Sequence, residues 1–249
     1  MKEWITCRNA VYEVLAARRR DVFRLLVADS AEIKEKLAEI VELAGKRKLT
    51  PAFVRRKQLD SLNENHQGVA LEVSGYPYAD LPDIFSRADE KNEPLFVLLL
   101  DVLQNPQNLG TLIRSAEAAG IHGIVIPLAR SAGVTPAVVH ASVGATEHML
   151  VASMNLGQAI NELHDRDVWV VGLDGGADSK MVEPKRLGGK LAIVVGSEGD
   201  GLRNLTRRQC DEIIRLPMRG KIESLNAAVA GSIVIYLSYI EHRQQSSPD

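Results

Sequence analysis

The sequence contains few aromatic residues and few cysteines. Phe, Trp and Tyr make up 4% of its 249 residues, so a binding surface built from many stacked aromatic rings is not expected. The two cysteines, Cys7 and Cys210, are too few for a disulfide framework and do not form a metal-ligand pair. The histidines are not spaced as metal ligands are. We therefore expect no bound metal.

Long hydrophobic runs are also missing. No stretch approaches the roughly 18 consecutive apolar residues that a membrane-spanning helix needs, and no long apolar stretch follows the first four residues. Hydrophobic residues make up 45% and charged residues 25% of the chain, which is ordinary globular composition. Together with the low cysteine content, this predicts a protein of the reducing cytoplasm.

Charge is distributed unevenly along the chain. The formal net charge is −2, but residues 1–60 carry an excess of basic residues and the remainder an excess of acidic ones. Basic residues cluster at Arg18–Arg20, Lys46–Lys48 and Arg55–Lys57. This pattern fits a polyanionic partner such as RNA. It also fits solvated helix ends and loops, and charge alone does not decide between the two.

The N-terminal pattern predicts a small α/β domain over residues 1–75. Residues 5–29 have the pattern of a helix followed by a strand, and residues 31–44 that of an amphipathic helix. A shorter helix is predicted over 51–62 and a strand over 68–73. Turn-forming and charged residues then dominate residues 76–93, which we interpret as a linker. An ordered surface arm is the alternative for this segment.

The remainder, residues 94–249, predicts an α/β domain with a parallel sheet. Strands are expected at 95–100, 124–126, 168–173, 191–195 and 212–216, and helices at 109–119, 136–147, 156–165, 202–210 and 224–241. Alternating strands and helices favour a parallel sheet covered by helices on both faces. Ligands of such sheets bind at the carboxyl ends of the strands.

The first polar segment at a predicted strand end is Asp101–Arg114. Asn108 precedes a helix, Gly110 lies at the start of that helix, and Arg114 follows Gly110 by one helical turn. A helix N-terminus offers free N–H groups to an anion, and Arg114 could project toward the same ligand. A plain N-cap at Asn108 and a surface arginine at Arg114 are the structural alternative.

Two further polar segments follow predicted strands. In Gly196–Leu202 three glycines allow close backbone approach to a ligand, and Glu198 adds a carboxylate. A tight turn before a helix is the alternative. In Leu216–Asn226, Ser224 is a good N-cap for the last helix, and Asn226 is a polar residue in its first turn. The small residues that follow permit close packing.

These three segments resemble the motifs of the SpoU/TrmH family of RNA ribose methyltransferases, within the SPOUT superfamily. The first motif matches Asn108, Gly110 and Arg114. The second is a Gly-x-Glu-Gly-x-Gly loop, matched by Gly196, Glu198, Gly199 and Gly201. The third is a Pro followed by Ser-Leu-Asn, matched by Pro217, Ser224, Leu225 and Asn226. All three occur in order, over residues 95–241.

The N-terminal part resembles the small substrate-binding domain of that family, which looks like an RNA-binding ribosomal protein. Asn9-Ala10-Val11 and His66-Gln67-Gly68 carry this resemblance. Cys7 departs from it, since glycine is usual there, and leaves the first turn uncertain. The layout is more similar to the rRNA guanosine methyltransferases than to the tRNA enzymes, which usually lack this domain.

The resemblance implies a knotted parallel-sheet catalytic domain with a trefoil knot, a homodimer, and S-adenosylmethionine as cofactor. The implied reaction is methylation of a ribose 2'-hydroxyl of RNA, at a guanosine of large-subunit rRNA. The implied catalytic residues are Arg114, Asn108, Glu198, Ser224 and Asn226. The implied cofactor-binding residues are Gly196, Leu216, Met218, Ser224, Leu225 and Asn226. No metal is implied.

Other functions remain open at this point. A tRNA 2'-O-methyltransferase and a non-catalytic RNA-binding protein on the same fold are the alternatives within the resemblance. A nucleotide-dependent oxidoreductase is a further alternative, although the glycines of Gly196–Leu202 do not match the G-x-G-x-x-G order.

Overall fold

The computed structural model describes residues 2–129, 131–176, 178–197, 199, 201–222 and 224–246. The chain divides into two compact units. The first unit contains the chain up to Pro77 together with Val134–His148, and the second contains Tyr78–Gly133 and the chain from Met149 onward. None of the described helices is both long enough and apolar enough to span a membrane.

The first unit is built on a sheet with the strand order β1-β4-β2-β3. Its elements, in chain order, are β1 (Lys2–Thr6), α1 (Arg8–Ala17), β2 (Val22–Ala28), α2 (Lys36–Lys46), β3 (Pro51–Val54), α3 (Arg56–Asp60), β4 (Val69–Ser74), α6 (Pro136–Ala141) and the 3-10 helix η1 (Ala145–His148). Strand β4 pairs antiparallel with β1 and β2, and β2 pairs parallel with β3. Helix α3 packs through Leu59 on Leu26 and Ala70 of the sheet.

A buried ion pair ties Val134–His148 to the rest of the first unit. Nη2 of Arg20 lies 2.9 Å from Oε1 of Glu147, and both side chains are fully buried. The hydroxyl of Tyr76 donates to the carbonyl oxygen of Thr146 over 3.1 Å, and burial raises the pKa of Tyr76 to about 12. Since removing one partner of a buried ion pair costs about 3–5 kcal/mol, this segment is firmly held in the first unit.

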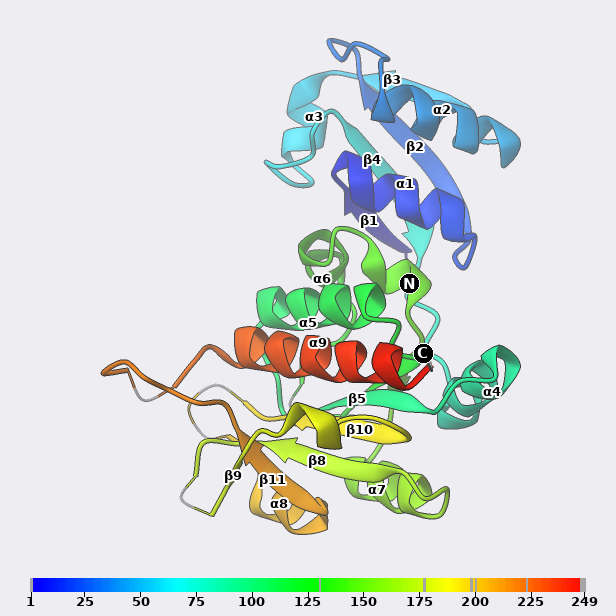
Figure 1. The fold of residues 1–249 in the computed structure, drawn as a ribbon. Helices are drawn as coiled ribbons and strands as arrows, with labels where there is room; N and C mark the ends of the chain where they lie inside the picture. The colour runs from blue at the N-terminus through cyan, green and yellow to red at the C-terminus, as the bar shows by residue number, and fades with distance from the viewer. Residues whose placement is uncertain are drawn as a thin grey trace. The chain divides into compact units, whose positions relative to one another are not determined.

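The second unit is built on a parallel sheet with the strand order β7-β6-β5-β10-β8-β11-β9. Figure 1 labels β5, β10, β8, β11 and β9 of this sheet. Its elements are α4 (Leu81–Lys91), β5 (Phe96–Leu100), α5 (Pro106–Ala118), β6 (Gly123–Ile126), β7 (Val151–Ser153), α7 (Leu156–His164), β8 (Trp169–Leu173), β9 (Lys180–Met181), the 3-10 helix η2 (Pro184–Arg186), β10 (Leu191–Val195), α8 (Asn204–Gln209), β11 (Glu212–Arg215) and α9 (Ala227–Ser246). Every pairing between these strands is parallel.

Helices cover both faces of this sheet. One face packs on α4 and α7, with Val97 and Val194 of the strands in the shared apolar core. The neighbouring strand residues Phe96 and Val195 point to the opposite face because side chains alternate along a strand. There Phe96 stacks on His242 of α9, with ring centroids 4.8 Å apart.

Helices α5 and α9 lie side by side on that second face (Figure 1). Their close approach depends on small residues. A Cβ on Gly231 would lie 2.7 Å from Cδ2 of Leu112, and the hydroxyls of Ser115 and Ser232 are 2.8 Å apart. The prediction that the small residues of the last helix allow close packing is confirmed.

The fold class predicted from the sequence is confirmed, but three local predictions are wrong. Residues 2–6 form a strand before the first helix, and residues 51–54 form strand β3 where a helix was expected. The predicted linker 76–93 contains helix α4, whose Leu81, Ile84, Phe85 and Ala88 are buried. These four residues recur at helical spacing, so the charged residues between them form its solvent-facing side.

The trefoil knot is not among the features that strand order and pairing establish. It stays a prediction from the resemblance.

Candidate functional site

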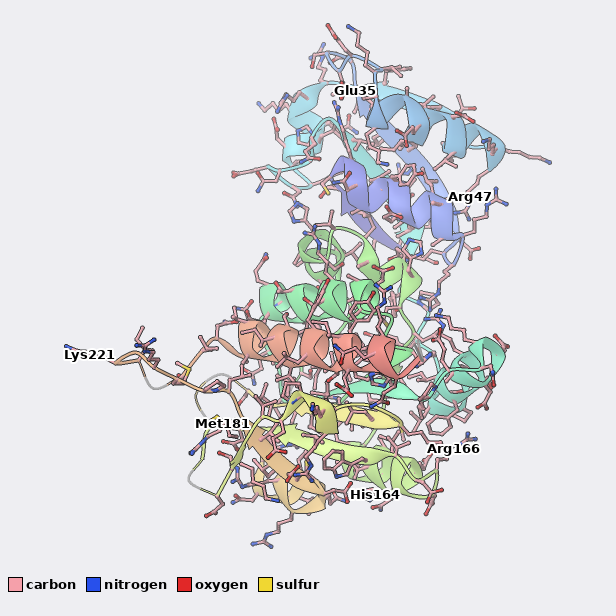
Figure 2. All side chains as sticks on the ribbon, viewed as in Figure 1. Glu35, Arg47, His164, Arg166, Met181 and Lys221 are labelled. Atoms are coloured by element: carbon pink, nitrogen blue, oxygen red, sulfur yellow. The ribbon has the colours of Figure 1, made fainter. Side chains whose placement is uncertain are left out.

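A cavity of about 670 Å³ lies at the carboxyl ends of β8, β10 and β11. Its lining residues come from the ends of these strands and of the edge strand β9, from the loops that follow β8, β10 and β11, and from the start of α9: Leu173, Asp174, Gly175, Met181, Val195, Gly196, Ser197, Gly199, Gly201, Arg215, Leu216, Met218, Ser224, Leu225, Ala227 and Ala230. Met181 and Lys221 are labelled at this end of the sheet in Figure 2. The second and third sequence motifs therefore meet at one cavity.

The loop after β10 folds back tightly on itself. The amide of Ser197 donates to the carbonyl oxygen of Gly201 over 3.0 Å, and a Cβ on Gly196 would collide with the backbone of Gly201. Gly199 and Gly201 have φ values of 93° and 65°, a region that favours glycine. The glycines are thus needed to form the cavity wall. Glu198 lies outside the described residues.

Two aspartates to which the sequence analysis assigned no role hold the segment that follows this loop. Asp101, directly after β5, accepts hydrogen bonds from the backbone N–H of Arg203 over 2.9 Å and from its Nε over 2.6 Å. Asp174, directly after β8, pairs with Arg207 over 2.7 Å. Both aspartates follow apolar strands at the end where ligands of parallel sheets bind, and this position could have identified them.

Asn226 joins the third motif to the first. Its Oδ1 accepts hydrogen bonds from the backbone N–H groups of Ala228 and Val229 over 2.9 and 3.1 Å. Because those groups can only donate, the Nδ2 of Asn226 faces the other way, and it donates to Oδ1 of Asn108 over 3.2 Å. Asn226 is therefore the N-cap of α9.

The predicted N-cap role of Ser224 is wrong. Helix α9 begins at Ala227, so Ser224 is too far from its first turn to accept from the free N–H groups there. Ser224 instead lines the cavity and is exposed. The cofactor-binding predictions for Gly196, Leu216, Met218, Ser224 and Leu225 fall on residues that line this cavity.

In α5 the N-cap is Asn105, not Asn108. The Asn105 side chain accepts from the amide of Gln107 over 2.8 Å, and Pro106 occupies the first helical position, where its missing N–H costs nothing. Asn108 lies within the helix and is 9% exposed. The structural alternative of a plain cap at Asn108 is therefore wrong.

Arg114 lies on α5, the same helix as Asn108 and Gly110. It is on the exposed side of α5, opposite the buried Leu112, Ile113 and Ala116. It does not line the cavity, and no hydrogen bond or ion pair joins it to another part of the described chain. The expectation that it projects toward the same ligand as the helix start stays a prediction.

The cavity fits a small organic molecule better than a metal ion. Pockets for such ligands typically measure about 300–1,000 Å³ and combine apolar walls with a few polar groups, as here. Across the described residues, no group of three or more His, Cys, Asp or Glu side chains is placed to hold a metal. Burial raises the pKa of the nearby Cys210 thiol to about 12, so this thiol is not a nucleophile at neutral pH.

In the first unit, a separate open cleft of about 590 Å³ is lined by Arg8, Arg56 and Gln67, among others. The Nε of Arg8 donates to the carbonyl oxygen of Gln67 over 3.1 Å, and the Gln67 side chain accepts from the Arg8 amide over 3.0 Å. Gln67 and Gly68 have positive φ values, so His66–Gly68 forms a tight turn. The turn orients one arginine toward an open surface.

Comparison with known proteins also divides the chain in two, but residues 134–148, which pack in the first unit, fall within the C-terminal match. The SpoU rRNA Methylase family matches residues 95–236, and the domain described as RNA 2'-O ribose methyltransferase substrate binding matches residues 4–79. The TrmH family protein YacO of Bacillus subtilis is 42% identical over 241 residues, which is 95% of each chain.

Two solved structures share the fold over nearly the whole chain. The SpoU methyltransferase AviRb of Streptomyces viridochromogenes, in complex with AdoMet, has a TM-score of 0.80 at 23% identity and covers 99% of this chain and 92% of its own. An AdoMet-bound rRNA methyltransferase of Sinorhizobium meliloti has a TM-score of 0.77 at 21% identity, with coverages of 99% and 88%. The family match and the similarity to YacO show that the chain belongs to the SpoU/TrmH family of RNA methyltransferases.

Proposed function

We propose that this protein is an S-adenosylmethionine-dependent RNA 2'-O-ribose methyltransferase. The observation that carries this proposal is the meeting of the second and third motifs at one cavity, joined to the first motif by the Asn226–Asn108 hydrogen bond. When bound, the cofactor supplies a methyl group activated by its positively charged sulfur. The residues of the chain have to bind that cofactor, orient the ribose and stabilise the oxygen that loses its proton.

The cavity residues fit the parts of S-adenosylmethionine. Leu173, Leu216, Met218 and Leu225 offer apolar surface for the adenine ring. The backbone at Gly196, Leu216, Met218 and Leu225, which line the cavity, would hold the adenosine and methionine parts by hydrogen bonds, and the Ser224 hydroxyl would add one more. Asn226 supports the pocket indirectly, since it caps α9 at the point where Ala227 joins the lining.

Arg114 is the residue we assign to the chemistry. A guanidinium in a protein keeps its proton, so a role as general base is unfavourable. It can instead stabilise negative charge that develops on the ribose 2'-oxygen, or bind the adjacent phosphate with two parallel hydrogen bonds. Its exposure on α5 leaves it accessible to RNA. Glu198 would orient this arginine, and Asn108 would position the ribose or the arginine.

The protein would act as a homodimer. Val229, Ile233, Tyr236 and Ile240 of α9 are 46%, 39%, 44% and 49% exposed, and their spacing places them along one side of the helix. Such an apolar stripe is usually covered by a partner. A second copy is the partner we propose, because Arg114 lies on the neighbouring α5 and does not line the cavity of its own chain. In a dimer it could complete the partner's site.

The RNA would be held by the first unit, with a guanosine of large-subunit rRNA as the target. The cleft beside Arg8 and Arg56 supports this, since arginine side chains are well suited to phosphate groups. The presence of an N-terminal substrate-binding domain favours rRNA, and tRNA is the alternative substrate.

The test is transfer of tritiated methyl groups from S-adenosylmethionine to unmodified transcripts of large-subunit rRNA and of tRNA. Digestion of the product to nucleosides should yield labelled 2'-O-methylguanosine from rRNA only. Label in a base would contradict the proposed reaction. Label in tRNA alone would show that tRNA, and not rRNA, is the substrate. No transfer to either RNA, by protein that binds the cofactor, would favour a non-catalytic RNA-binding role.

A further inference from the structure

Two of the described residues that line the cavity are charged, Asp174 and Arg215. Only the side chain of Asp174 has an ion-pair partner. Asp174 pairs with Arg207 over 2.7 Å and accepts from the amide of Gly176 over 3.0 Å. The side chain of Arg215 has no hydrogen bond or ion pair with any part of the chain that the structure describes. Among the described lining residues, the cavity therefore presents one guanidinium without a carboxylate partner and one carboxylate that is already paired.

The position of Arg215 is set by the sheet. It is the last residue of β11, and its carbonyl oxygen accepts from the amide of Val182 over 2.9 Å. It pairs in register with Met181, which also lines the cavity. Arg215 is half-buried, whereas Arg219 and Lys221 on the following segment are exposed. A half-buried cation at a strand end is better placed for a ligand inside the cavity than for the backbone of an RNA.

The proposed cofactor carries one anionic group, the carboxylate of its methionine part. Enclosing a carboxylate without a counter-charge is costly. Arginine provides a planar pair of donors that matches a carboxylate. The other lining residues are apolar, glycine, serine or the paired Asp174, and none of them offers a positive charge.

We propose that Arg215 binds the methionine carboxylate of the cofactor and thereby selects ligands that keep the amino-acid part. This rests on the proposed function for the identity of the cofactor. Arg215 would act in binding, since it contacts a part of the molecule remote from the transferred methyl group.

The test compares two ligands that differ in the amino-acid part. S-adenosylhomocysteine carries it and 5'-methylthioadenosine lacks it. Isothermal titration calorimetry would measure both ligands with the full-length wild type, Arg215→Gln, Arg215→Lys and the exposed control Arg219→Gln. Arg215→Gln should lower the affinity for S-adenosylhomocysteine about 10-fold or more, as expected for the loss of a hydrogen bond to a charged group. The affinity for methylthioadenosine should not change. Arg215→Lys should be intermediate, and Arg219→Gln should match the wild type.

The outcomes separate this proposal from the proposed function. If Arg215→Gln lowers the affinity for both ligands equally, or for neither, the assignment of Arg215 to the carboxylate is wrong. The identity of the cofactor would not be affected by that result. Unchanged ligand affinities with weaker RNA binding would assign Arg215 to RNA instead. If the wild type binds neither ligand, the cofactor assignment itself is wrong. A cooperative thermal unfolding transition shows that a variant is folded. If Arg215→Gln is not folded, the same comparison of the two ligands is made with Arg215→Lys.

Discussion

The Nδ2 of Asn226 donates a hydrogen bond to Oδ1 of Asn108, over 3.2 Å and across 118 positions of sequence. The same Asn226 caps α9 through its Oδ1. One side chain therefore fixes the start of α9 and connects it to α5, the helix that carries Arg114. This bond is the physical link between the first and third motifs.

Replacing Asn226 by Ser should separate the two roles of this side chain. Ser is a good N-cap, but its side chain is shorter and has no amide to donate to Asn108, so the bond between the helices is lost while the cap remains. Asn226→Ala loses the cap as well and should cost about 1 kcal/mol more. Urea denaturation of Asn226→Ser, Asn108→Ala and the double variant measures their coupling. Strictly additive losses would show that the bond contributes nothing.

Arg114→Ala should lower methyl transfer about 100-fold or more, as for the loss of one group that stabilises developing charge. Cofactor affinity should be unchanged because Arg114 does not line the cavity. Single-turnover transfer and calorimetry with S-adenosylhomocysteine measure the two quantities separately. Arg208→Ala, at an exposed arginine of α8, is the control. Near-normal transfer by Arg114→Ala would remove this residue from the mechanism.

Cys7 has φ 71° and ψ 141° immediately before α1, a conformation that essentially only glycine adopts without strain. Cys7→Gly should therefore be more stable than Cys7→Ala by about 1 kcal/mol, the reverse of the usual order of these residues. Both variants lose the thiol, so their difference in free energy of unfolding isolates the backbone strain. A more stable Cys7→Ala would mean that the turn relaxes in solution.

His122 should make stability fall in mild acid. Burial lowers its pKa below the ordinary value of 6.5, and its Nδ1 accepts from the amide of Phe96 over 3.0 Å. The unfolded chain binds this proton more readily, so stability is full above about pH 6.5 and decreases as pH falls toward the lowered folded pKa. His122→Asn keeps an acceptor for Phe96 and should lose less stability between pH 7.5 and pH 5.

The control for His122 is His164→Asn, at a partly exposed histidine. Denaturation midpoints of the three proteins at both pH values measure the effect. If His122→Asn and the wild type lose equal stability, the acid sensitivity comes from other groups.

The central strands β5 and β10 could be predicted because they are buried on both faces. Leu95–Leu100 and Leu191–Val195 are continuous apolar runs, and both are strands at the centre of the sheet. Strand β3 was mistaken for a helix because an edge strand of four residues, two of them exposed, shows no clear alternation. Helix α4 is not evident from the sequence, because its many charged residues are also typical of a linker.

The site was only partly visible in the sequence. Glycines at Gly196 and Gly201 indicate close backbone approach, and the structure explains why a Cβ cannot be placed at Gly196. The Asn226–Asn108 bond could not be predicted from spacing, because it depends on how α9 packs against α5. The start of α9 was placed too early for a related reason, since Ser224 and Asn226 are both good caps and local sequence does not choose between them.

Mapping of 2'-O-methyl groups on ribosomal RNA tests the central claim most directly. RNA would be compared from cells with the gene, without it, and with the Arg114→Ala form restored in its place. The account predicts one guanosine of large-subunit rRNA that is methylated in the first and unmethylated in the other two. Identical methylation of rRNA in all three would contradict it.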